Sequence, residues 1–163
     1  MDPHVHIRQV LTSKGETIRL EKFLYAKAGM RYIDFEHELG HVSQLEKLKQ
    51  PMPNEQVLAN GRPYKGPEIP KVNIQRGAII EYENRLQEFF RLRDRGVDPH
   101  VLEEHANGVR AARQLYADRM QRARSAGQNF VNQNFPHLPE LDARFVREEG
   151  SAVTNYHAEG NNQ

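Results

Sequence analysis

Residues 35–42, with the sequence FEHELGHV, constrain the fold and the chemistry of this chain more than any other stretch. His37, Glu38 and His41 spell H-E-x-x-H. Residues four apart lie on the same face of an α-helix, so both imidazoles can bind one ion. Glu38 follows the first histidine and can reach a metal-bound water without becoming a ligand itself. Zinc with two imidazoles, one carboxylate and one open position activates that water near neutral pH, and Glu38 takes its proton.

The surroundings of this motif predict a helix over residues 35–49. Asp34 is a suitable N-cap, three residues before His37. Apolar residues recur at helical spacing and predict a buried stripe beside the histidines: Phe35, Leu39, Val42 and Leu45. The alternative is that both histidines are ordinary helix residues and the match is chance. The agreement of cap and stripe favours a zinc site.

A second helix, predicted over residues 77–94, offers the third ligand. Its apolar face consists of Ile79, Tyr82, Leu86, Phe89 and Phe90. At 100° per residue, Glu83 falls beside this face, whereas Glu81 points nearly the opposite way. A carboxylate at the edge of an apolar face needs a partner, and a zinc ion would be one. We therefore predict Glu83 as the third ligand and Glu81 as the second choice. A solvated glutamate is the alternative for either.

The composition bounds the class of protein. The 163 residues suit a single domain over 1–150, followed by a polar, frayed tail over 151–163. The absence of cysteine excludes disulfides, thiolate metal sites and zinc deaminases of the His/Cys/Cys type. Basic and acidic residues nearly balance, with a net charge of +1, which argues against nucleic acid as a partner. No apolar run is long enough to span a membrane and no signal peptide is evident, so we expect a cytoplasmic protein as expressed.

The remaining segments predict an α+β fold. Residues 1–24 read as a β-hairpin with a turn at 13–16. Residues 50–76 are rich in proline, glycine and asparagine, and we interpret them as a substrate-side lid or, about equally, as a linker. A third helix is predicted over 98–126, with Asp98 as its N-cap and an inward face that includes Val101 and Leu115. A short helix is predicted over 140–149. The C-terminal half is thus mainly helical.

Three other sets of residues have a functional and a simpler interpretation. His4 and His6 alternate on the first strand and resemble ligands, but solvated strand histidines are commoner. Residues 110–124 contain five arginines and one acidic residue, Asp118, and this local charge of +4 could bind an acidic partner, although a solvated helix face is the favoured interpretation. The pair Tyr156–His157 could donate a hydrogen bond to an oxyanion.

The motif and the downstream glutamate helix resemble a known family. Together they are similar to the zincin metallopeptidases, specifically the gluzincin arrangement. Glu83, before Asn84 and Arg85, matches the ligand in the Glu-Ala-Asn segment of short regulatory peptidases that cleave phage repressors; Asn84 and Arg85 depart from that pattern. Over residues 31–93 the chain most resembles the metallopeptidase toxin domains of bacterial polymorphic toxins.

This resemblance implies a zincin-like fold and zinc-dependent hydrolysis of a peptide bond in a protein substrate. It also implies a toxin or effector domain delivered into a target cell as part of a larger secreted protein, with an immunity or inhibitor protein as partner. Two alternatives stay open. One is a regulatory peptidase that cleaves a repressor, and the other is a non-catalytic helical binding module that uses the arginine-bearing helix.

Overall fold

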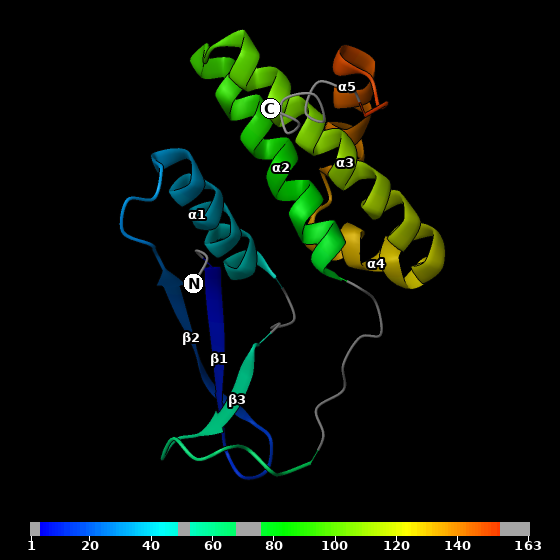
Figure 1. Cartoon of the computed structure of the whole chain (residues 1–163). Coiled ribbons are helices and arrows are strands. Elements are labelled where there is room, and N and C mark those ends of the chain that lie inside the picture. Colours follow the sequence, from blue (N-terminus) through cyan, green and yellow to red (C-terminus); the bar gives the residue numbers. More distant parts are fainter. Residues whose placement is uncertain (1–3, 49–52, 68–75, 154–163) are drawn as a thin grey trace. The chain divides into compact units, whose positions relative to one another are not determined.

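The computed structural model describes residues 4–48, 53–67 and 76–153 (Figure 1). The chain forms two compact units, residues 1–73 and 74–163. In the described part, the first unit contains a three-stranded sheet and one helix, and the second contains four helices. The predicted α+β class, with an N-terminal sheet and a mainly helical C-terminal half, is confirmed. That residues 1–150 act as one domain stays a prediction.

The predicted N-terminal hairpin is present. β1 (His4–Leu11) pairs antiparallel with β2 (Thr17–Tyr25). In the turn, the Thr12 amide donates to the Glu16 carbonyl at 2.8 Å, and Gly15 has a φ of 91°. A positive φ is costly for residues with a Cβ, which explains glycine at this point of the turn.

A third strand, which the sequence did not reveal, completes the sheet. β3 (Glu55–Leu58) runs parallel to β1, so the strand order is β2-β1-β3. The interpretation of residues 50–76 as a loop is therefore wrong for residues 55–58, which form this strand. Residues 49–52 and 68–75 lie outside the described part. Proline and glycine flank this short strand, and its pairing partner lies far away in the sequence. β1 is the central strand, and accordingly its apolar side chains Ile7, Val10 and Leu11 are buried.

The helix that carries the H-E-x-x-H motif begins earlier than predicted. α1 spans Tyr32–Lys47, and its N-cap is Arg31, which makes no side-chain capping bond. The predicted N-cap, Asp34, lies in the first turn, where its Oδ2 pairs with the Arg31 Nε at 2.9 Å. The predicted buried stripe is wrong in part, because Leu39 is 42% exposed and Phe35, Val42 and Leu45 are half-buried. The buried side chain of this helix is instead that of Gln44. α1 lies against β1 and β2.

The second unit is built on a helical hairpin. α2 (Arg76–Arg95) packs against α3 (Pro99–Ala123). The predicted apolar face of α2 is buried, with each of its five residues at most 7% exposed. The predicted cap of α3 is also confirmed, since the Asp98 side chain accepts a hydrogen bond from the His100 amide at 2.8 Å.

Two shorter helices complete this unit, and one was not predicted. α3 ends before Arg124, whose φ of 50° is unfavourable for a residue other than glycine, and α4 (Ser125–Asn134) starts in a new direction. The single helix expected up to residue 126 is thus two helices. α5 (Leu138–Glu149) corresponds to the predicted short helix. Phe130 and Phe145 are buried and anchor α4 and α5.

The outer face of α3 differs from the prediction. Val101 and Leu115, expected to face inward, are 37% and 55% exposed. Arg110, expected on a solvated face, is only 4% exposed. Its guanidinium donates to the Glu103 carboxylate and to the Glu149 carbonyl, both at 2.8 Å. The C-terminal end of α5 offers carbonyl acceptors to this buried cation, which local sequence patterns do not reveal.

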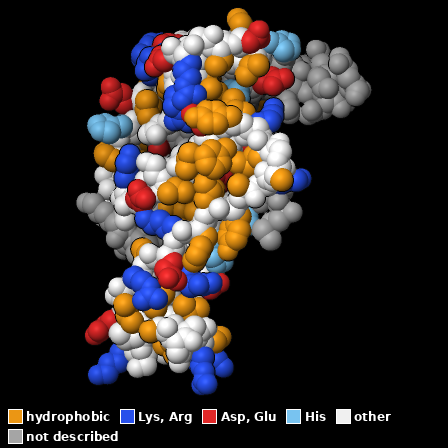
Figure 2. Space-filling model, turned by 90° about the vertical axis from the view of Figure 1, so that its left-hand side faces the viewer, with side chains coloured by type: hydrophobic (Ala, Val, Ile, Leu, Met, Phe, Trp, Pro, Cys, Tyr) orange, Lys and Arg blue, Asp and Glu red, His pale blue; other side chains and the backbone are white. Residues whose placement is uncertain are grey.

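Surface charge is mixed in sign. Basic and acidic side chains are interspersed over the face shown in Figure 2, with hydrophobic side chains between them. Within the described part, no helix has the length and apolar character needed to cross a membrane.

Candidate metal centre

The two motif histidines lie next to each other on α1. The ring centroids of His37 and His41 are 4.9 Å apart, and the ring planes are nearly perpendicular, at 88°. Both side chains are half-buried. This arrangement follows from the four-residue spacing on a helix, and it presents two ring nitrogens from one surface of α1.

Gln44 orients the second histidine. His41 Nδ1 and Gln44 Oε1 are 2.8 Å apart, and Gln44 is 3% exposed. An amide oxygen only accepts hydrogen bonds, so the neutral imidazole carries its proton on Nδ1 and its lone pair on Nε2. A buried partner of this kind holds a metal-binding histidine in one tautomer and one orientation. The sequence interpretation missed Gln44; its position three residues after His41 on the same helix was the available signal.

Glu38, the predicted general base, is half-buried on the same helix. Among the residues that the structure describes, none forms a hydrogen bond or an ion pair with its side chain. The described side chains thus leave this carboxylate accessible to a water molecule, as the predicted role requires.

The two candidate carboxylates of α2 lie in different surroundings. The Glu81 side chain is 35% exposed, and its Oε1 accepts from the Arg85 Nε at 2.8 Å. Glu83 is only 4% exposed. Because two residues correspond to about 200° of helix rotation, the two side chains leave α2 on opposite sides.

The rotation of α2 about its axis is set by Tyr82, between these glutamates. Tyr82 is fully buried, and its hydroxyl donates to the Asp142 carboxylate of α5. The same carboxylate accepts from the Arg113 Nε of α3 at 2.7 Å. Burial, together with the hydrogen bond to Asp142, raises the pKa of Tyr82 and keeps its hydroxyl a donor. This three-helix contact fixes the directions of Glu81 and Glu83 within the second unit.

The strand histidines are engaged with neighbours instead of being solvated as expected. The His4 ring stacks on Tyr25 with centroids 4.9 Å apart. His6 Nε2 lies 3.0 Å from the Glu55 Oε2. The other candidate pair, Tyr156–His157, lies outside the described residues.

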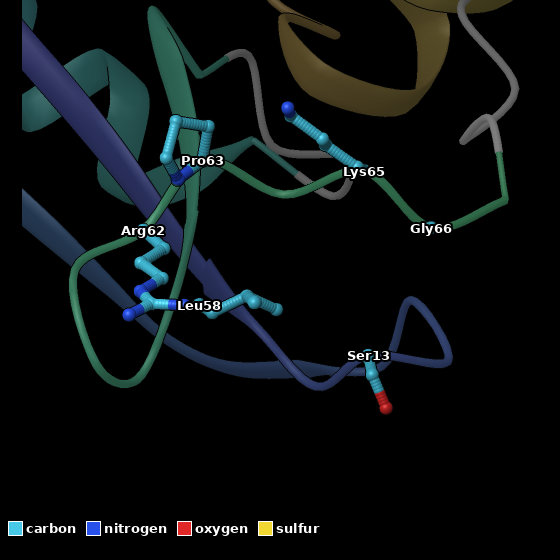
Figure 3. A pocket seen from close by; sticks show the side chains of 6 residues that line it. All are labelled: Ser13, Leu58, Arg62, Pro63, Lys65 and Gly66. Atoms are coloured by element: carbon cyan, nitrogen blue, oxygen red, sulfur yellow. The ribbon is translucent and has the colours of Figure 1, made fainter.

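The first unit also contains a hollow of about 480 Å³ (Figure 3). It lies between the β1–β2 turn and the segment after β3, and its lining consists of Ser13, Leu58, Arg62, Pro63, Lys65 and Gly66. None of the H-E-x-x-H residues lines it, so it is a feature distinct from the candidate metal centre.

Comparison with protein-family models, with curated proteins and with solved structures finds no match for this chain. The likeness to gluzincins therefore depends on the motif residues and on the glutamates of α2.

Proposed function

We propose that this protein is a zinc-dependent peptidase that hydrolyses a peptide bond in a protein substrate. The observation that carries the proposal is the histidine pair of α1, with the tautomer of His41 set by the buried Gln44. Chance H-E-x-x-H matches on a helix surface have no reason to include a buried hydrogen-bond partner for a ring nitrogen.

The donor set fits zinc. Imidazoles are borderline ligands that suit this ion, and two of them lie side by side on α1. A carboxylate would complete the protein ligands of a catalytic site. A bound zinc ion supplies Lewis-acid chemistry at such a site. Glu38 accepts the proton of the attacking water and delivers it to the leaving amine, since it is the acidic residue adjacent to the first ligand.

A carboxylate of α2 is the proposed third ligand. Glu83 is the choice from helix periodicity, and Glu81 is the alternative. Accessibility favours Glu81, because His37, His41 and Glu81 carry suitable donor atoms and are all half-buried, whereas Glu83 is sealed in the interior of its unit. Arg85 would then hold the carboxylate of Glu81 in place from its other oxygen.

The toxin or effector context is proposed on the sequence resemblance alone, as are an inhibitory partner protein and delivery into a target cell. The binding-module alternative stays a proposal as well. Of its five arginines, Arg110 is buried and Arg113 is paired with Asp142, whereas Arg122 and Arg124 are exposed.

The first test is elemental analysis of the purified protein with a His37→Ala/His41→Ala variant as control. We expect one zinc per chain in the parent and none in the variant. Glu38→Gln should retain zinc and lose nearly all hydrolysis of an identified substrate, because only the proton acceptor is removed. A parent that binds no zinc after reconstitution refutes the proposal, and normal turnover by Glu38→Gln refutes the mechanism.

A matched pair of variants identifies the third ligand. Glu81→Gln and Glu83→Gln each remove one charge from α2 with little change in volume, so their zinc affinities can be compared directly. The ligand variant should lose affinity by well over tenfold, while the other should bind zinc as the parent does. Far-UV circular dichroism separates loss of a ligand from unfolding, which is the relevant control for the buried Glu83.

A further inference from the structure

The hollow beside the sheet has fixed walls. On one side, the β1–β2 turn is closed by the bond from the Thr12 amide to the Glu16 carbonyl. On the other, the segment after β3 is held by the bond from the Leu58 amide to the Arg62 carbonyl at 2.8 Å, and the Tyr64 hydroxyl donates to the Pro67 carbonyl at 2.6 Å. A ligand would meet these walls already formed and would not have to order them.

Tyr64 joins the two walls, and glycine is required on both sides of its ring. A Cβ on Gly15 would lie 2.8 Å from the Tyr64 hydroxyl, and one on Gly66 would lie 2.5 Å from the Ser13 carbonyl. Both distances are shorter than a non-bonded contact between a carbon and an oxygen atom allows. The close approach of the turn and the segment after β3 therefore depends on these glycines. The shape of the hollow is thus built into the sequence.

Arg62 and Lys65 bring two positive charges to the lining of the hollow. In the first unit, Arg8, Arg19 and Arg31 each pair with a carboxylate. Arg62, by contrast, has no ion pair with any residue that the structure describes, and the same holds for Lys65. Glu55, before this segment, is paired with Arg8. Glu16, in the β1–β2 turn, is the acidic residue among the described residues of the two walls, 12–16 and 58–67. The two cations of the lining therefore outnumber the acidic side chains of these walls.

The positions of these cations indicate the shape of a ligand. In Figure 3, the Arg62 guanidinium lies beside Leu58, whereas the Lys65 ammonium points toward the upper side of the view, so the two cationic groups point in different directions. A single tetrahedral anion needs donors that converge on one point, whereas two separated carboxylates on an extended segment do not. The apolar part of the lining suits an aliphatic side chain. No aromatic face lines the hollow, as stacking of nucleic-acid bases would require.

We propose that this hollow binds an acidic segment of a partner protein, with an aliphatic side chain against Leu58 and Pro63 and carboxylates paired with Arg62 and Lys65. The volume of about 480 Å³ lies in the range of ligand sites. The proposal is independent of zinc and of peptide hydrolysis.

The test uses the full chain and a fluorescein-labelled Glu-Asp-Leu-Glu-Asp peptide, with binding followed by fluorescence anisotropy. Two matched peptides replace either the leucine by serine or the acidic residues by their amides. The parent should bind the acidic leucine peptide best, and binding should weaken as salt is raised. Amide shifts in NMR spectra should be confined to the lining, at Ser13, Leu58 and Gly66.

Charge variants separate the hollow from general attraction. Arg62→Gln/Lys65→Gln should weaken peptide binding about tenfold, the sum expected for two partly exposed ion pairs. Lys27→Gln/Lys47→Gln removes the same charge from exposed positions elsewhere in the first unit and should bind as the parent does. Equal loss in both double variants, shifts away from the lining, or no binding by the parent would overturn the proposal. Equally strong competition by inorganic phosphate would also overturn it, since the site would then be one for a simple anion.

Discussion

Replacement of Gln44 by leucine tests how the chain prepares His41 for metal. Leucine fills nearly the same buried volume but cannot accept the proton of Nδ1. The His41 Nδ1–H would then lose this acceptor, and the ring could adopt the other tautomer, with Nε2 protonated. An unsatisfied donor of this kind costs about 1–3 kcal/mol, and loss of such a partner typically lowers metal affinity by about 10–100-fold. The energetic cost and the expected loss of affinity agree, because a tenfold change in affinity corresponds to about 1.4 kcal/mol.

Zinc affinity can be measured by competition with a chromophoric chelator, with two further variants of α1 as controls. Ser43→Ala alters the exposed neighbour of Gln44 and should leave the affinity unchanged. Gln44→Glu restores an acceptor with a charge and should bind zinc at least as tightly as the parent. If His41→Ala abolishes zinc binding while Gln44→Leu binds like the parent, Gln44 has no part in orienting the ring.

Three further predictions concern stability. Tyr82→Phe removes one donor from Asp142 and keeps the ring, so chemical denaturation should show a loss of about 2 kcal/mol in unfolding free energy. Phe145→Ala leaves a cavity at a fully buried position and should cost about 3–5 kcal/mol in the same assay. The Arg8 hydrogen bond lowers the pKa of Glu55 below its ordinary value of 4.5. The ionised Glu55 therefore contributes fully to the β1–β3 pairing above pH 4.5. This contribution is lost as the pH falls through the lowered pKa that Glu55 has in the folded protein. Hydrogen exchange of β3 amides should accelerate in that acidic range, and it should do so less in Glu55→Gln, which has no charge to lose.

Local signals predicted the elements whose causes are local. The apolar face of α2 repeats at helical spacing, and Asp98 before a proline marks the start of α3; both are present in the structure. The hairpin was predictable for the same reason, because its two strands are joined by a short turn that contains Gly15.

The features that sequence reasoning missed depend on distant partners. β3 exists because β1 offers it hydrogen bonds, and nothing within residues 55–58 announces this. Arg110 is buried because α5 places acceptors beside it, which only the packed helices show. Gln44 was overlooked for another reason. A glutamine is ordinary on a helix, and its importance comes from the histidine that it contacts.

The parallel pairing of β3 on β1 has a consequence for the order of folding. Arg8 and Glu55, which pair across these strands, are 47 residues apart, and α1 lies entirely within the loop that this pairing closes. The β1–β2 hairpin can form from near neighbours, but β3 can join only after the chain has paid the entropy of that closure. We therefore expect β3 to be among the last elements of its unit to become protected from hydrogen exchange during refolding, after the hairpin and the helix that lies against it.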